Sequence, residues 1–323
     1  MTTTSFKSIA SSSPIALGTA GFGTGVTKEE AFQLLDAYVA ADGNHVDTAH
    51  DYASWVPGGA GASELTIGEW LRKSGARDRV FLATKVGCTH GEKKRIQREV
   101  VRSELALSLE RLGVDRVNLL WLHRDDPAVP VDEILDWLEE LRRENKFILS
   151  GASNWSSARL AEARERAAAK GIPGFSASQC GWNLAAVEPN SFPAGDARFI
   201  ELTDEKWHNK TRFPLIAWEA QAGGFFSGQY DANRKPDSPR ANVVMAHYAN
   251  PANWRRLALA REIAQNRNVT PNQIALAWLR QQAFPVVSII GPRTMEQLQD
   301  SLASRAVTLT FGENLQLRTA TIT

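Results

Sequence analysis

Short apolar segments alternate with longer segments of helical periodicity along the whole chain. The apolar segments are expected to be strands, and they lie at 14–17, 44–47, 80–85, 117–123, 147–153, 175–179, 213–218 and 285–291. Between them, apolar residues recur at intervals of three and four, which is typical of helices packed by one face. This periodicity predicts helices at 27–41, 61–74, 94–112, 131–144, 156–170, 251–265, 271–282 and 294–304.

Regular alternation of strand and helix predicts a single-domain (β/α)8 TIM barrel over 1–323. The strands are mostly apolar, as expected when both faces of a parallel sheet are buried. Three stretches, 49–60, 181–211 and 223–248, are expected to be long loops that shape a pocket. A doubly wound sheet is the alternative, but the glycines at 18, 21, 23 and 25 do not have the spacing of a dinucleotide fingerprint.

Composition narrows the class of protein. A net charge of +1 over 323 residues argues against nucleic acid or an anionic membrane as the main partner. Cys88 and Cys180 are too few for a disulfide framework and are expected to be thiols in a reducing compartment. Residues 1–13 are polar, and no apolar run approaches the ~18 residues of a membrane span, so we expect a cytoplasmic protein.

Polar and aromatic residues stand at the ends of the predicted strands. The series is Asp47, Lys85, His123, Ser153, Asn154, Gln179, Trp218 and Gly291. The carboxyl ends of barrel strands form one face, and active sites lie there. Because lysine is almost never fully buried without a partner, the joint placement indicates a functional site.

Tyr52 follows one of these strand ends and is a candidate acid. A phenol has an ordinary pKa of about 10, and a nearby cation lowers it. Lys85 is expected to be that cation, with Asp47 orienting it, while His123 hydrogen-bonds a substrate oxygen or relays a proton. A tyrosine acid facing a carbonyl group needs a hydride donor, and a bound nicotinamide is the donor that fits.

Several motifs in order along the chain give a resemblance to a known family. They read Asp47-Thr-Ala-x-x-Tyr52, Ala83-Thr-Lys85, Leu122-His123, Gly151-x-Ser-Asn154, Gln179-x-x-Trp-Asn183 and Gly224-x-x-x-Gly228. From about Leu17 to Ser301 the chain resembles the aldo-keto reductases.

The resemblance implies roles for individual residues. Asp47, Tyr52, Lys85 and His123 would be the catalytic four, with Tyr52 the general acid. Ser153, Asn154 and Gln179 would bind the nicotinamide carboxamide, and Trp218 would stack on its ring. The segment Glu219–Gly228, with Gly223, Gly224 and Gly228, would wrap the pyrophosphate, and 1–13 is a candidate lid below the barrel.

The segment Gly291–Gln297 suggests where the far end of the cofactor would lie. Thr294 and Gln297 predict a capping box at a helix start, and Arg293 just before it suits a phosphate. The resemblance implies the 2′-phosphate of NADPH/NADP+ at Arg293, with NADH less favoured, and Gln297 and Asp300 near the adenosine. Glu219 departs from the small residue common in relatives, and a carboxylate there is unfavourable unless it turns away or pairs.

Three aromatic residues, Phe22, Trp55 and Trp121, are candidate walls of a substrate pocket. His50, Asp51 and Arg124 are polar neighbours that could hydrogen-bond hydroxyl groups. Aromatic walls with polar groups suit a sugar carbonyl and equally a general aldehyde, so the expected partner is a small-molecule carbonyl or alcohol.

Three other functions have support in the sequence. His45, Asp47 and His50 resemble the metal ligands of a barrel hydrolase, although no metal is expected here. Lys85 at a strand end could be the Schiff-base lysine of an aldolase. A non-catalytic, cofactor-sensing subunit, like the channel-associated members of the family, is the third.

Overall fold

Eight parallel strands close into a barrel in the computed structural model, which describes residues 8–89, 93–188, 191–192 and 197–320. The strands are β1 (Ile15–Gly18), β2 (His45–Asp47), β3 (Phe81–Val86), β4 (Val117–Leu122), β5 (Phe147–Ser153), β6 (Ser178–Gly181), β7 (Leu215–Trp218) and β8 (Val286–Ile290). Each strand pairs with the next, and β1 pairs with β8, which completes the (β/α)8 fold predicted from the sequence.

Alternation along each strand divides the side chains between two buried layers. On β3, Leu82 belongs to the large outer core, whereas Ala83 belongs to the cluster inside the barrel. Trp121 on β4 is also in the inner cluster. Lys85 follows Ala83 by two residues, so the same alternation places it on the inner face at the carboxyl end, which we call the mouth.

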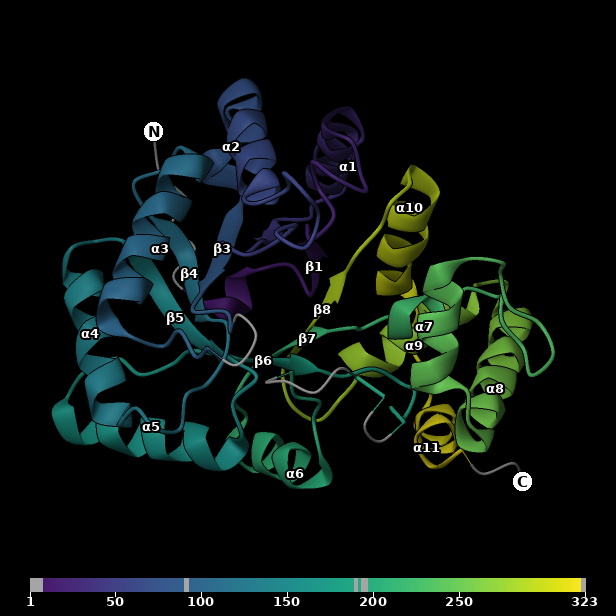
Figure 1. The fold of residues 1–323 in the computed structure, drawn as a ribbon. Helices are drawn as coiled ribbons and strands as arrows, with labels where there is room; N and C mark the ends of the chain where they lie inside the picture. The colour runs from purple at the N-terminus through teal and green to yellow at the C-terminus, as the bar shows by residue number, and fades with distance from the viewer. Residues whose placement is uncertain (1–7, 90–92, 189–190, 193–196, 321–323) are drawn as a thin grey trace.

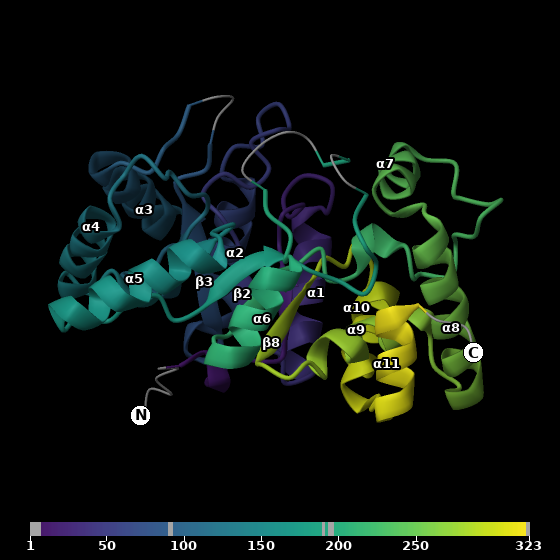
Figure 2. The ribbon, with the colours of Figure 1, turned by 90° about the horizontal axis from the view of Figure 1, so that it is seen from below.

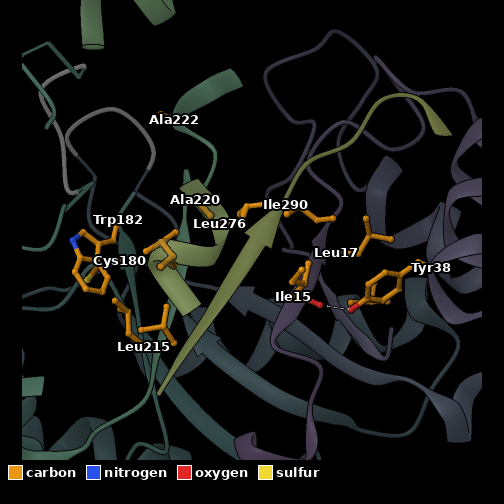
Figure 3. Packing of buried hydrophobic residues seen from close by; sticks show 14 of the residues in the cluster. Ile15, Leu17, Tyr38, Cys180, Trp182, Leu215, Ala220, Ala222, Leu276 and Ile290 are labelled. Carbon is orange, nitrogen blue, oxygen red and sulfur yellow. Dashed lines mark hydrogen bonds between the residues drawn. The ribbon is translucent and has the colours of Figure 1, made fainter. Parts of the chain in front are cut away.

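The outer core joins the strands to the surrounding helices (Figure 3). Tyr38 is wholly buried there, and its hydroxyl group donates to the Ile15 carbonyl oxygen over 2.6 Å. The same hydroxyl oxygen accepts from the His45 backbone nitrogen at 3.0 Å. One side chain from the first helix therefore ties β1 to β2.

The amino end of the barrel, which we call the floor, is covered by the start of the described chain. The 3-10 helix η1 (Ile9–Ser11) buries Ile9 in the inner cluster. Asn44 links this segment to β2, because its Oδ1 accepts from the Ser13 backbone nitrogen at 2.6 Å. Residues 8–13 of the candidate lid at 1–13 therefore pack against the floor, while residues 1–7 lie outside the described part.

Helices surround the barrel (Figures 1 and 2). Those flanking the strands are α1 (Lys28–Ala40), α2 (Ala62–Ser74), α3 (Arg98–Leu112), α4 (Val131–Arg143), α5 (Ser157–Lys170), α6 (Leu202–Thr211), α9 (Pro271–Arg280) and α10 (Met295–Ala303). The connection from β7 to β8 also holds α7 (Pro239–Tyr248) and α8 (Pro251–Arg267), and α11 (Phe311–Thr319) packs on α8. In the described residues no helix is both long and apolar enough to cross a bilayer.

The observed elements differ from the sequence prediction in five places, four helices and one strand. Helix α3 begins at Arg98 rather than at residue 94. Helices α6 and α7 lie inside the stretches 181–211 and 223–248, which were expected to be loops, and α11 was not predicted. Strand β6 lies at Ser178–Gly181 rather than at 175–179.

Candidate functional site

The centre of the site is the Lys85 ammonium group at the barrel mouth. Lys85 is 1% exposed, and its Nζ donates to Asp47 Oδ2, to the Thr48 carbonyl oxygen at 2.8 Å and to Tyr52 Oη at 2.9 Å. Asp47 is fully buried, and its other oxygen accepts from Gln179 Nε2 at 3.1 Å. The buried charge is therefore paired and all three of its donor positions are used.

The segment after β2 delivers Tyr52 to Lys85. The Thr48 backbone nitrogen donates to the Ala83 carbonyl oxygen at 3.0 Å, and that of His50 donates to the Lys85 carbonyl oxygen at 2.9 Å. These bonds continue the contact with β3 beyond the end of β2. The turn that follows then brings the Tyr52 hydroxyl group back over the mouth.

The pKa of Tyr52 is raised above its usual value of 10.0 in the protein, which reverses the expected lowering. Burial of the hydroxyl group is the largest cause, Lys85 opposes it, and the Asp47 charge offsets part of the Lys85 effect. The pKa of Lys85 is raised despite its burial, because Asp47 and Tyr52 favour the charged form. At neutral pH the pair is thus a protonated phenol beside an ammonium ion.

His123 completes the group of four at the end of β4. Its ring lies edge-on to the Tyr52 ring, with 6.1 Å between centroids. Burial, with Arg124 and Lys85 nearby, holds the pKa of His123 well below 6.5, so the imidazole is neutral. Its Nδ1 is buried and has no hydrogen-bond partner within the described residues, which leaves a polar atom for a ligand.

The three residues expected at a carboxamide lie together on β5 and β6. Ser153 Oγ donates to the Gln179 carbonyl oxygen at 3.0 Å and accepts from Asn154 Nδ2 at 3.0 Å. Asn154 also donates to the His123 carbonyl oxygen at 3.0 Å, and its Oδ1 accepts from the Arg198 backbone nitrogen at 2.9 Å. Asn154 therefore ties the His123 strand end to the loop after β6.

Trp218 ends β7 and meets two aromatic residues that the sequence analysis missed. The rings of Phe199 and Phe192 lie 4.7 Å and 6.1 Å from its ring, both edge-on. Gly181 allows this approach, because a Cβ atom there would be 2.6 Å from the Phe199 ring. Both phenylalanines come from the long loop after β6, whose sequence gave no signal beyond its length.

The segment after Trp218 forms a tight turn with open space beside it. Backbone φ angles are positive at Glu219, Ala222, Gly223, Gly224 and Gly228. At Gly224 and Gly228, as at Gly291 after β8, an added Cβ atom would meet no atom within 4 Å. A backbone that curves around open space suits close approach to a phosphate group.

The Glu219 carboxylate is paired inside the protein, which is the condition under which a negative charge is tolerated at this position. Its Oε1 is 3.3 Å from Arg240 Nη2, and its Oε2 accepts from Tyr248 Oη at 3.2 Å. Arg240 lies on α7, a helix absent from the prediction, so neither partner could be assigned from the sequence.

Residues of the predicted adenosine end lie beside this turn, and one prediction made for them is corrected. Gln221 in the turn accepts from the Gly291 backbone nitrogen at 3.4 Å and donates to Ser301 Oγ at 3.0 Å. Thr294 caps α10, but the Gln297 side chain accepts from the Arg293 backbone nitrogen at 2.8 Å, so the capping box is incomplete. The Arg293 side chain is exposed.

The Asp300 side chain faces α9 and accepts hydrogen bonds there. Its carboxylate accepts from Thr270 Oγ1, Asn272 Nδ2 and Gln273 Nε2, each at 2.7 Å. These three residues form the start of α9, so Asp300 hydrogen-bonds their side chains, and this use of its carboxylate competes with the expected adenosine contact.

The candidate substrate residues divide into two groups. Phe22 is 1% exposed in the outer core and Trp121 is fully buried inside the barrel, so neither is an exposed pocket wall. Trp55 is 64% exposed and lies 6.4 Å from the Tyr52 ring, between centroids. Arg124 is half-buried and donates to the His123 carbonyl oxygen at 3.0 Å.

The geometry does not support the metal or Schiff-base alternatives. His45 lies at the floor with Nδ1 3.3 Å from Ser12 Oγ, whereas His50 Nδ1 lies 3.2 Å from Ser108 Oγ on α3. No group of three metal-ligating side chains occurs among the described residues. A Schiff-base lysine needs a lowered pKa, and that of Lys85 is raised.

Comparison with known proteins gives consistent matches along the chain. The sequence model of the Aldo/keto reductase family matches residues 14–320. The chain is 30% identical over 306 residues to aldo-keto reductase str7 of Strobilurus tenacellus, covering 94% of this chain and 84% of that protein. Norsolorinic acid reductase stcV of Emericella nidulans is 29% identical, with 93% of this chain and 76% of that protein covered. Protein tas of Escherichia coli is 27% identical, with coverage of 90% and 89%.

Proposed function

Because this chain belongs to the aldo/keto reductase family, we propose that it is an NADPH-dependent enzyme that reduces an aldehyde or ketone to the alcohol. Membership makes it an oxidoreductase of small-molecule carbonyl compounds in a family that generally uses NAD(P)H. The observation that carries the finer proposal is the Lys85 ammonium group, which bonds Asp47 and Tyr52 at once.

Tyr52 is the proton donor in this proposal. Its raised pKa keeps the phenol protonated at neutral pH, as a donor must be. Lys85, 2.9 Å from the hydroxyl oxygen, stabilises the phenolate that remains after the proton leaves. In the same proposal Asp47 keeps Lys85 charged and oriented, and the neutral His123 ring donates a hydrogen bond to the carbonyl oxygen of the substrate.

The residues at the mouth fit a nicotinamide dinucleotide, which supplies the hydride when bound. Trp218 offers an aromatic ring at the end of β7, and Ser153, Asn154 and Gln179 offer polar groups at β5 and β6. The open turn at Gly224 and Gly228 suits the pyrophosphate. Exposed Arg293 is the residue we propose for the 2′-phosphate, which favours NADPH over NADH.

The substrate is proposed to enter past Trp55. This ring is exposed beside Tyr52 and offers a flat apolar surface. His50, which was expected to bind hydroxyl groups, makes hydrogen bonds inside the protein. A general aldehyde or ketone therefore fits this edge of the site better than a polyhydroxylated sugar.

The Tyr52→Phe variant tests the acid role. Removing the hydroxyl group should lower kcat for carbonyl reduction by about 100-fold or more, the scale of general acid catalysis. NADPH affinity, measured by quenching of tryptophan fluorescence, should change by less than about twofold, because Tyr52 is proposed to contact the substrate only. Turnover equal to that of the unmodified enzyme would contradict the assignment, and a protein that binds neither nucleotide would contradict the proposed function itself.

A further inference from the structure

The backbone of His50 is held from two sides, by β3 and by α3. Its backbone nitrogen donates to the Lys85 carbonyl oxygen at 2.9 Å. On the other side, its carbonyl oxygen accepts from Arg111 Nη1 at 3.2 Å. Because Tyr52 is only two residues further on, the position of His50 sets where the turn carrying Tyr52 begins.

Arg111, at the end of α3, is itself fixed by a buried carboxylate. Its Nη1 lies 3.2 Å from Glu64 Oε2, and the two side chains are 16% and 0% exposed. The other Glu64 oxygen accepts from Thr84 Oγ1 at 2.7 Å. Since Thr84 precedes Lys85 on β3, a second path of contacts runs from β3 through Glu64 and Arg111 to His50.

The packing around Arg111 leaves it little freedom. Gly61, with φ +78°, lies against the guanidinium group, and a Cβ atom there would be 2.6 Å from Arg111 Cζ. A buried ion pair of this kind contributes little net stability, because removing both charges from water offsets much of their attraction. The ion pair matters more for geometry than for stability, because a guanidinium group holds several acceptors in fixed directions.

We propose that Arg111 is a positioning residue for catalysis. It holds the His50 carbonyl oxygen and thereby keeps the Tyr52 hydroxyl group 2.9 Å from Lys85 Nζ. This inference rests on the proposed role of Tyr52 as the acid. Arg111 touches neither the substrate nor the four catalytic side chains, so its effect should fall on kcat and on its pH dependence.

The main test is the double variant Arg111→Met/Glu64→Gln, which removes the donor to His50 without leaving Glu64 charged and unpaired. Displacing a catalytic group by ~1 Å can cost up to ~100-fold in rate, so we expect kcat to fall by about tenfold or more. KM for the carbonyl compound and the NADPH dissociation constant should stay within about twofold. The high-pH limb of the kcat profile should move, because the Tyr52 pKa depends on its distance from Lys85.

Two further variants make the result decisive. Arg102→Met carries the same substitution on the same helix, but Arg102 pairs with Glu144 on the surface, and its kcat should not change. Arg111→Lys keeps the charge opposite Glu64 and so should fold, yet it lacks the planar fork and should lose most of the rate.

Wild-type kcat and an unshifted pH profile in the folded Arg111 variants would overturn the proposal. So would an equal loss in Arg102→Met, which would indicate a general effect on α3. Absence of carbonyl reduction by the unmodified enzyme would instead reject the proposed function. This outcome is measured on the unmodified enzyme alone and does not depend on the variants.

Discussion

Opposing electrostatic effects meet at the Tyr52 hydroxyl group. Burial favours the neutral phenol, the Lys85 ammonium group favours phenolate, and the buried Asp47 charge cancels part of the Lys85 effect. The balance raises the pKa of Tyr52, so its side chain is a neutral phenol rather than a phenolate at neutral pH. The lowered Tyr52 pKa expected from the sequence took account of the Lys85 cation but not of the cost of burying a charged phenolate.

This balance predicts a flat pH dependence for carbonyl reduction. In the proposed mechanism activity needs Tyr52 protonated, so it should fall only as pH rises through a pKa above 10.0. His123, with a pKa well below 6.5, does not change charge above neutrality. We expect kcat to stay constant within about twofold between pH 7 and 9 in buffers of constant ionic strength. A decline centred near pH 8 would show that the acid has a lowered pKa.

Arg293 provides a second prediction at this scale. Arg293→Ala should weaken NADPH binding by roughly tenfold or more, since a charge-assisted contact contributes about 1.5–3 kcal/mol. NADH, which lacks the 2′-phosphate, should bind with unchanged affinity and is the internal control. Fluorescence titration with both nucleotides measures the ratio, and an equal loss for both would remove Arg293 from the 2′-phosphate site.

The residues that the sequence could identify share one property. Asp47, Lys85 and His123 end apolar strands, where a polar side chain stands out. Arg111 lies in the last turn of a helix, where a basic residue ordinarily complements the helix dipole at the surface. Only the spatial approach of α2 and α3 shows that it is half-buried and paired with the buried Glu64.

At the scale of elements, α2 and α3 meet at a glycine. A Cβ atom at Gly68 would lie 2.2 Å from the Arg111 carbonyl oxygen and 2.9 Å from the Leu112 carbonyl carbon. Both are backbone atoms, which cannot rotate away as a side chain can. The close contact places α3, and with it Arg111, against α2.

Gly68→Ala should therefore destabilise the protein by about 1–3 kcal/mol, the usual cost of overpacking. Urea unfolding followed by tryptophan fluorescence measures the change. Gly312→Ala in α11 is the control, because an added Cβ atom there meets nothing within 4 Å. The control should be neutral or stabilising by up to about 1 kcal/mol, as alanine favours helix over glycine. Equal behaviour of the two variants would show that α3 moves freely.

The helices that escaped prediction lack a continuous apolar stripe or were hidden by loop-like composition. Helix α6 buries Asp204 and His208, and these polar residues are held by Ser157 and by the Phe213 carbonyl oxygen. Periodicity of apolar residues cannot detect such a face. Signals did exist elsewhere, since Ser238 caps α7 ahead of a proline and Thr310 forms a capping box with Glu313 in α11.

At the scale of the whole molecule, alternation of strand and helix was enough to predict a closed barrel and the face at which the candidate site residues gather. It could not predict what each loop contributes, because contacts such as Phe199 on Trp218 or Arg240 on Glu219 join residues through tertiary packing alone. The closed sheet fixes the strand ends, whereas the long connections after β6 and β7 fold by contacts with one another and with the mouth.

The floor of the barrel makes the fold sensitive to acid. His45 is fully buried beside Phe81, and burial is the main cause that lowers its pKa from 6.5 to about 4, with Asp47 raising it and Lys85 lowering it. Between these values the unfolded chain binds a proton at His45 that the folded protein does not. The stabilising contribution of neutral His45 is therefore complete above pH 6.5 and is lost as pH falls toward 4.

Protonation of this one residue should lower the free energy of unfolding by on the order of 3 kcal/mol. The figure follows from 1.36 kcal/mol for each unit by which the pKa is lowered. His45→Leu should remove that part of the pH dependence, although His123 and His208, whose pKa values are also lowered, will keep a residual slope. Urea unfolding of both proteins at pH 7.5, 6, 5 and 4.5 gives the difference directly. Parallel curves for the two proteins over this range would mean that His45 takes up its proton as readily in the folded protein as in the unfolded chain, so that burial at the floor does not lower its pKa.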